Sequence, residues 1–214
     1  MKSTLLEQAA RSIVDRTIEK PPASAVVEEL LALEKHSKSL KQSNPLEQLI
    51  GTWRLIFVTG TKKTRQRAGI VLGAGRYLPK WVEISLSYRE IIPDNVKRSY
   101  PEGNRHPTLE FEVGWVYNQV RVGALQLSLN GPLKLSRKNN ILAFDFTQID
   151  LTALGAKLYD GYLREGRSKE QAFDAAPIGK QAFFNYFWLG DNAIAARGRG
   201  GGLALWAKPE RTDL

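Results

Sequence analysis

From residue 46 onward, apolar side chains alternate along the chain with a period of two, and this pattern is the main constraint on its fold. The clearest run begins at Gly51, after which Trp53, Leu55 and Phe57 fall on one face. Glycine permits a sharp bend into the run. The run is therefore predicted to be the first strand of a sheet, with a tryptophan large enough to floor a barrel.

Further alternating runs follow, separated by turn residues. Many short antiparallel strands joined by turns are typical of a barrel or a sandwich. A slip of phase at Gly123-Ala124 indicates a β-bulge, and Asn130-Gly131-Pro132 indicates a turn. The apolar faces of the expected strands would line the barrel and contact a ligand: Leu55, Phe57, Val82, Ile84, Leu86, Phe111, Val113, Trp115, Leu127, Phe144 and Phe146.

Two segments before the strands have apolar residues at helical spacing. The first covers residues 5–18, follows a capping box that starts at Thr4, and ends before Pro21-Pro22. The second starts at Ser24, and the polar run over residues 35–45 predicts a linker. We expect this amphipathic pair to pack on its own domain, with docking to a protein or a membrane as the alternative.

Residues 152–182 interrupt the strand pattern. Helical spacing from Leu154 to Leu163, and a second capping box at Ser168, predict a helical insert. It could be a lid or a membrane-contacting element, or it could simply pack on the barrel. The sequence therefore predicts a mainly β chain, an antiparallel barrel with an N-terminal helical pair and a helical insert before the last strands. Its expected divisions are a helical segment, residues 1–45, and a barrel, residues 46–210.

The formal net charge of +9 favours anionic partners such as lipid headgroups, nucleic acid or acidic proteins. A basic loop after the first strand is expected to contact anionic lipid or an acidic partner, unless it is only solvated. No uncharged apolar run approaches the ~20 residues that span a bilayer, so membrane contact is expected to be peripheral. An amphipathic pattern follows Met1-Lys2-Ser3, so no secretory signal is expected. The residues expected to contact an anionic surface are Lys62, Lys63, Arg65 and Arg67.

Groups that carry enzyme chemistry are sparse. There is no cysteine, and the two histidines, His36 and His106, cannot form a multi-histidine metal site on their own. Glu110 and Glu112 could form a carboxylate pair, although a solvated strand face explains them more simply. The glycine-rich run over residues 198–202 resembles a phosphate loop only in composition, and a hairpin turn is the simpler interpretation. We therefore expect no enzyme activity, no metal and no cofactor.

Two segments resemble the plastid-lipid-associated protein (fibrillin) family, which is lipocalin-like. Asn44-Pro45-Leu46, followed by Leu49-Ile50-Gly51-Thr52-Trp53-Arg54-Leu55-Ile56-Phe57, is similar to the opening of that family's domain. Tyr186-Phe187-Trp188-Leu189-Gly190-Asp191-Asn192, followed by Arg197-Gly198-Arg199-Gly200-Gly201-Gly202-Leu203, is similar to its closing segment. The chain departs from the family at Ile194-Ala195-Ala196-Arg197-Gly198, where the first of the family's two arginines is missing.

The resemblance implies non-enzymatic binding or transport of hydrophobic metabolites, such as prenylquinones, carotenoids or other lipids, at photosynthetic membranes. It implies a structural barrel base in which Gly51 precedes Trp53 and Arg197 covers its indole, a contact that cation–π attraction would favour. It also implies a place in the cytoplasm or at the thylakoid surface of a photosynthetic prokaryote, or in the plastid or plastoglobule for a processed plastid form.

Other interpretations of the sequence stay open. The aromatic side chains could pack the interior completely and leave no cavity. The protein could then be a scaffold for an enzyme of quinone or pigment metabolism. Interleaved basic and aromatic residues, as at Trp53-Arg54 and Tyr88-Arg89, are also found in binders of single-stranded nucleic acid, although here the aromatic residues are expected to be buried.

Overall fold

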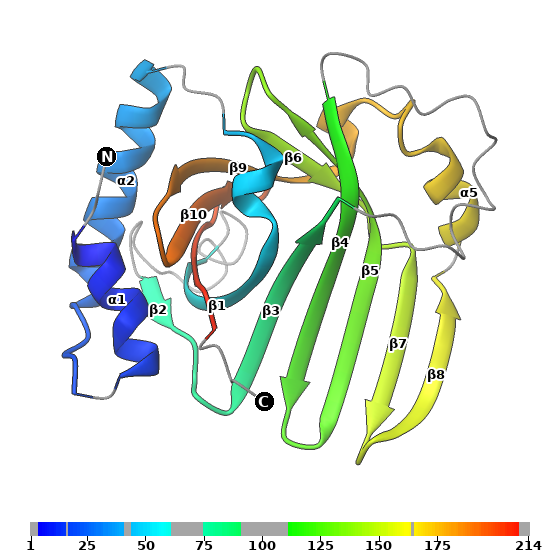
Figure 1. Ribbon diagram of the computed structural model, residues 1–214, viewed down its shortest axis with the longest axis horizontal. Coiled ribbons are helices and arrows are strands. Elements are labelled where there is room, and N and C mark those ends of the chain that lie inside the picture. Colours follow the sequence, from blue (N-terminus) through cyan, green and yellow to red (C-terminus); the bar gives the residue numbers. More distant parts are fainter. Residues whose placement is uncertain are drawn as a thin grey trace. The chain divides into compact units, whose positions relative to one another are not determined.

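A computed structural model describes residues 4–15, 17–40, 44–60, 75–90, 111–163 and 165–209 of the chain. The chain is mainly β and contains a closed eight-stranded antiparallel β-barrel, which confirms the predicted fold class (Figure 1). Two helices, α1 (Thr4–Val14) and α2 (Ala23–Leu40), precede the strands, as expected. The structure divides into two compact units, which are described separately below.

The first unit comprises residues 1–42, 52–80 and 184–214. Its strands pair in the order β2-β1-β11-β10-β9, all antiparallel. Their bounds are β1 (Gly51–Thr59), β2 (Gly75–Tyr77), β9 (Ala182–Leu189), β10 (Ala193–Gly198) and β11 (Leu203–Ala207).

The helices α1 and α2 cover one face of this sheet, which we call the helix-covered face. Leu6 of α1 and Leu30 of α2 are fully buried and belong to one apolar cluster with Leu205 of β11 and Ala195 of β10. Burial of apolar surface contributes about 25 cal/mol per Å², so this contact stabilises two helices that would be only marginally stable in isolation. The helices thus share a core with strands from both ends of the chain, and the two units do not follow the expected division at residue 45.

The helix α2 continues to Leu40, so the linker predicted to begin at residue 35 is wrong. Residues 35–39 are polar, but lysine and serine are compatible with a helix that is already formed. Tertiary contacts hold this last part in place. Glu34 is 7% exposed and binds both Lys38, one turn later, and Arg197 of β10.

The second unit comprises residues 43–51 and 81–183. A 3₁₀ turn, η1 (Leu46–Leu49), is held by Glu112, whose Oε2 accepts a hydrogen bond of 2.7 Å from the Leu46 N–H. Strands β3, β4, β5, β7 and β8 form a sheet in that order, and β6 pairs with the far half of β5. The bounds are β3 (Val82–Arg89), β4 (Phe111–Val122), β5 (Leu125–Ser136), β6 (Ile141–Phe144), β7 (Gln148–Ala153) and β8 (Ala156–Tyr162).

The long strands β4 and β5 form one hairpin, which corrects two expectations. Gly123-Ala124 is the hairpin turn and not a bulge, with Gly123 at a φ of 59°. Residues 130–132 continue β5 and do not form a turn. At Gly131 the strand exchanges one partner, β7, for another, β6. A Cβ at this glycine would lie 2.0 Å from the carbonyl oxygen of Asp145, so only glycine lets the chains approach this closely.

The predicted helix from Leu154 to Leu163 is also wrong, because this segment forms strand β8. Leu154 and Gly155 both have positive φ and make a two-residue hairpin turn between β7 and β8. A short helix, α5 (Gly166–Ala172), and a 3₁₀ turn, η2 (Ile178–Lys180), then follow. Helix α5 starts before Ser168, whose hydroxyl donates to the carbonyl of Glu165, so the predicted capping box is not formed.

Candidate functional site

The register of the second unit's sheet divides the predicted barrel lining between two faces. Ile84 of β3 pairs with Val120, which in turn pairs with Leu127 of β5. Trp115 of β4 pairs instead with Arg89, on the opposite face. Val82, Ile84, Leu86, Leu127 and Phe144 therefore share one face, and Phe111, Val113 and Trp115 share the other. The expectation that all of them line one cavity is wrong, because alternation along a strand does not tell which phase of its neighbour shares its face.

The face of Phe111 is covered near α5 by a buried lysine. Lys134 of β5 is 3% exposed and its ammonium lies 5.1 Å from the ring centroid of Phe173. The ammonium donates hydrogen bonds of 3.0, 3.0 and 2.7 Å to the carbonyls of Phe173, Asp174 and Ala176. Burial lowers the pKa of Lys134 below its usual range. Since all three donors of the ammonium are used, this lysine fastens the segment after α5 to the sheet.

The other face of the sheet is mainly apolar along β3, β4, β5 and β7, with Asn118 of β4 as a polar member, and we call it the apolar face. Leu86 and Phe144 are buried on it, but towards the hairpin turns its side chains become half-buried and then exposed. Members in the half-buried and exposed part are Val82, Ile84, Val120, Val122, Leu125, Leu127, Leu129, Ile149 and Leu151. The sheet therefore offers an apolar surface that the described part of the chain covers only in part.

Four strongly exposed apolar side chains lie at the end of this sheet where its hairpins turn, and we call them the apolar rim. Trp81 is 69% exposed, Val122 41%, Leu125 48% and Leu154 88%. Pairing brings them together, because Val122 is opposite Val82 and Leu125 is opposite Ala153. The N–H of Leu154 also donates 3.0 Å to the carbonyl of Ala124, which joins the two hairpin tips. Figure 1 shows both turns and the start of β3 at the same end of the sheet.

Leu154 is unfavourable in this position on two counts. Its φ of 52° is in the left-handed region, which costs a leucine about 1–2 kcal/mol. Its side chain is 88% exposed and so gains little from burial in the fold. Asparagine or glycine would suit this turn better. An unfavourable backbone that presents an apolar side chain to the solvent indicates a role in contact with another molecule.

Charged side chains occupy the opposite face of the same strands. Arg121 of β4 forms an ion pair with Glu83 of β3. The Nζ of Lys157 in β8 lies 2.9 Å from Oδ2 of Asp160 and 3.5 Å from Oδ2 of Asp150. Charged and apolar residues therefore lie on different faces at the end of the sheet where its hairpins turn, so this end is amphipathic.

In the first unit, Phe57 does not share a face with Leu55 as predicted. A register irregularity between Leu55 and Phe57 puts Leu55 opposite Trp206 and Phe57 opposite Leu205. Phe57 therefore joins the apolar cluster under the helices, where its ring meets that of Tyr77 edge to face at 5.1 Å. The extra residue at a bulge reverses the direction of every later side chain.

The predicted contact between Arg197 and Trp53 is also not formed. Arg197 is opposite Leu203 on the helix-covered face, where Nε donates 2.7 Å to Glu34. Trp53 is on the other face and is 1% exposed. The cation over the Trp53 ring is Lys208, whose Nζ lies 5.2 Å from the ring centroid.

Several other predicted features belong to local structure or lie outside the described residues. The glycine-rich run forms the turn between β10 and β11, with Gly201 at a φ of 82°. Gly51, at the start of β1, also has a positive φ, of 124°. The basic loop, Lys62 to Arg67, and both His106 and Glu110 lie outside the part that the structure describes. Glu112 is described, and it supports η1 as stated above. Within the described ranges, no three His, Asp or Glu side chains gather to hold a metal ion.

Comparison with family models and with curated proteins found no match to this sequence. The described helices include none that is long and apolar enough to cross a bilayer. The two most unusual residues of the structure, Leu154 and Lys134, were not singled out by the pattern analysis. The dipeptide Leu154-Gly155 between two alternating runs was the available signal for the exposed turn, whereas nothing local marked Lys134 as buried.

Proposed function

We propose that this protein binds lipids or similar hydrophobic molecules at a membrane surface and is not an enzyme. The observation that carries the proposal is the apolar rim, Trp81, Val122, Leu125 and Leu154, of which Val122 and Leu125 belong to the apolar face. Protruding apolar side chains gain free energy when they enter the headgroup region, where tryptophan is especially favoured. The net charge of +9 adds attraction to anionic lipid.

The apolar face supports binding of a hydrophobic molecule with few polar groups. Its half-buried side chains are mostly valine, isoleucine and leucine, which offer contact surface, and Asn118 adds one polar group whose buried Oδ1 accepts no hydrogen bond within the described residues. A long acyl or isoprenoid chain has matching chemistry. The resemblance to the fibrillin family points to prenylquinones or carotenoids at photosynthetic membranes, and a scaffold role without a ligand is the alternative to test against.

The sharpest test is Leu154→Asn. Asparagine tolerates positive φ, so the variant is expected to fold at least as stably as the wild type. It removes about 1.5–3 kcal/mol of apolar contact with the membrane, which corresponds to roughly tenfold weaker binding or more. The measurement is flotation with vesicles of phosphatidylcholine and phosphatidylglycerol, together with thermal unfolding of both proteins.

A matched control is Leu31→Gln, because Leu31 is 46% exposed on α2, away from the rim residues in sequence. It should float like the wild type. If Leu154→Asn binds vesicles as well as the wild type, or if Leu31→Gln loses as much binding, the apolar rim is not the contact surface. Purified protein that yields no hydrophobic molecule on extraction, and takes up no prenylquinone in a fluorescence titration, would favour the scaffold role.

A further inference from the structure

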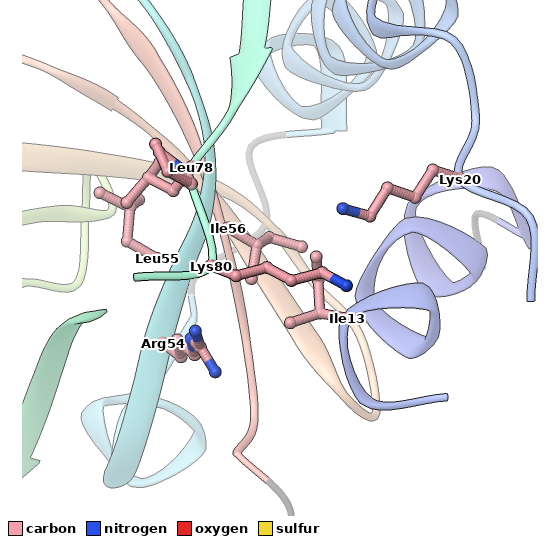
Figure 2. A pocket seen from close by; sticks show the side chains of 8 residues that line it. Ile13, Lys20, Arg54, Leu55, Ile56, Leu78 and Lys80 are labelled. Carbon is pink, nitrogen blue, oxygen red and sulfur yellow. The ribbon is translucent and has the colours of Figure 1, made fainter. Parts of the chain in front are cut away.

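A cleft of about 190 Å³ opens on the first unit (Figure 2). Its lining comes from α1, from the connection between α1 and α2, from β1 and from the segment after β2. Eight residues line it: Ile13, Lys20, Arg54, Leu55, Ile56, Leu78, Pro79 and Lys80. All eight belong to the same compact unit, so the cleft does not depend on how the two units are placed.

The cationic walls of the cleft are held by contacts outside it. Tyr77 of β2 donates a hydrogen bond of 2.9 Å from its hydroxyl to the carbonyl of Pro21, next to Lys20 in the chain. The ammonium of Lys20 also lies 5.2 Å from the centroid of the Tyr77 ring. On the other side, the N–H of Leu78 donates 2.9 Å to the carbonyl of Ile56, which positions the segment that carries Lys80. In Figure 2 the Lys20 and Lys80 side chains extend toward each other across the cleft.

The charge of the cleft is not balanced by its own lining. Lys20, Arg54 and Lys80 line it, and no aspartate or glutamate does. Within the residues that the structure describes, no carboxylate forms an ion pair with any of these three cations. Like charges that line one cleft repel one another, and a bound anion would reverse this cost.

The remaining lining is apolar, with Ile13 from α1 and Leu78-Pro79 from the segment after β2 among it. An inorganic anion has no apolar part and would make no favourable contact with these side chains. A volume of about 190 Å³ is below the ~300 Å³ at which pockets for drug-sized ligands begin. It suits a small anionic head together with the first carbons of an attached apolar chain.

We propose that this cleft binds the phosphate head of an anionic amphiphile. The guanidinium of Arg54 can donate two parallel hydrogen bonds to phosphate oxygens, and the two lysines supply mobile point charges around them. The apolar lining contacts the attached chain. Such a head could belong to a membrane phospholipid or to a free phosphorylated amphiphile. The site is separate from the apolar rim and does not rest on it.

Calorimetric titration of the whole protein with octyl phosphate tests the proposal. We expect octyl phosphate to bind more tightly than inorganic phosphate, because only the amphiphile uses the apolar lining, and more tightly than octyl glucoside, which has no charge. The double variant Arg54→Gln/Lys80→Gln should weaken octyl phosphate binding about tenfold or more, since it removes two charge-assisted contacts. Equal affinity for octyl glucoside, or unchanged affinity in the double variant, would overturn the proposal.

A second double variant, Lys35→Gln/Lys138→Gln, lowers the net charge by the same two units at exposed positions outside the cleft. It should bind octyl phosphate like the wild type, and an equal loss would show attraction by net charge alone, which contradicts the proposal.

Flotation with phosphatidic acid vesicles distinguishes a membrane phospholipid from a free phosphorylated amphiphile as the source of the head. Arg54→Gln/Lys80→Gln reduces this flotation if the head belongs to a membrane lipid and leaves it unchanged if the amphiphile is free. Leu154→Asn should bind octyl phosphate like the wild type, because Leu154 does not line the cleft. The octyl phosphate titration therefore tests the cleft whether or not the apolar rim binds membranes.

Discussion

Arg197 and Trp53 lie on opposite faces of the same sheet. Arg197 of β10 is on the helix-covered face, where it binds Glu34 of α2 and the carbonyl of Gly201 at 2.6 Å. Trp53 of β1 shares its face with Trp206, which is opposite Leu55 two residues later. The arginine therefore fastens the helix α2 to the closing hairpin, and the tryptophan belongs to a separate packing layer.

This ion pair predicts an acid-sensitive contribution to stability. Hydrogen bonding to Arg197 holds the pKa of Glu34 below its usual 4.5. A carboxyl whose pKa is lowered on folding stabilises the protein above its unfolded pKa and loses that effect as the pH falls through the folded pKa. Glu34→Gln should therefore cost about 1–2 kcal/mol of unfolding free energy at pH 7. Urea unfolding at a series of pH values should show the difference shrinking below pH 4.5.

Lys38→Gln is the matched control, because Lys38 also binds Glu34 but is 70% exposed. An exposed i,i+4 pair contributes only a few tenths of a kcal/mol, so this variant should unfold almost like the wild type. A Glu34→Gln variant that is as stable as the wild type at pH 7 would show that the pair does not stabilise the fold.

A second carboxyl, Glu170 of α5, predicts the opposite pH dependence. It is fully buried, and burial raises its pKa above 4.5, although hydrogen bonds from Thr147 and Gln148 oppose the shift. A raised pKa means that the stabilising effect is complete below pH 4.5 and is lost as the pH rises through the folded pKa. Glu170→Gln keeps the shape of the neutral acid and should be more stable than the wild type at pH 8.

Chemical unfolding at pH 4 and pH 8 checks this expectation. The advantage of Glu170→Gln should be larger at the higher pH, where the wild-type carboxyl must be kept neutral or buried as a charge. Glu165→Gln serves as a control, since Glu165 is exposed just before α5. Lower stability of Glu170→Gln at pH 8 would mean that the ionised form is the favoured one in the fold.

Lys134→Met should destabilise the segment after α5. The substitution keeps the apolar stem but removes the donor that three carbonyls share, at a cost of about 2–3 kcal/mol. Within the described residues, only the carbonyl of Phe173 keeps a side-chain donor, Gln181. Limited proteolysis should cut residues 173–181 faster in this variant. Lys169→Met, at an exposed position of α5, should not change the cleavage rate. Equal cleavage of Lys134→Met and the wild type would contradict the anchoring role.

The fold class could be predicted because it depends on the two-residue period of the apolar side chains. The run after Gly51 forms β1, and the alternating run from Val82 to Arg89 forms β3, because alternation is a local property of the strand. The insert was harder. Leu154 to Leu163 satisfies helical spacing by chance, and only the pairing of β8 with β7 makes it a strand.

The candidate site could be predicted only in part. Val82, Ile84 and Leu127 were expected to contact a ligand, and they share the apolar face. Trp115 and Phe57 were assigned to the same lining, but the pairing of β4 and the bulge in β1 turn them to other faces. The exposed rim was not predicted, because exposure depends on where the neighbouring hairpins end.

The sequence by itself determined the fold class, the two N-terminal helices and strands such as β1 and β3, since periodicity acts within a few neighbours along the chain. The tertiary structure alone decided which face each strand presents. Register depends on partners distant in sequence, and one bulged residue reverses all the side chains that follow. For this reason Trp53 was correctly expected in a first strand, whereas its neighbouring cation, Lys208, emerged only from the folded sheet.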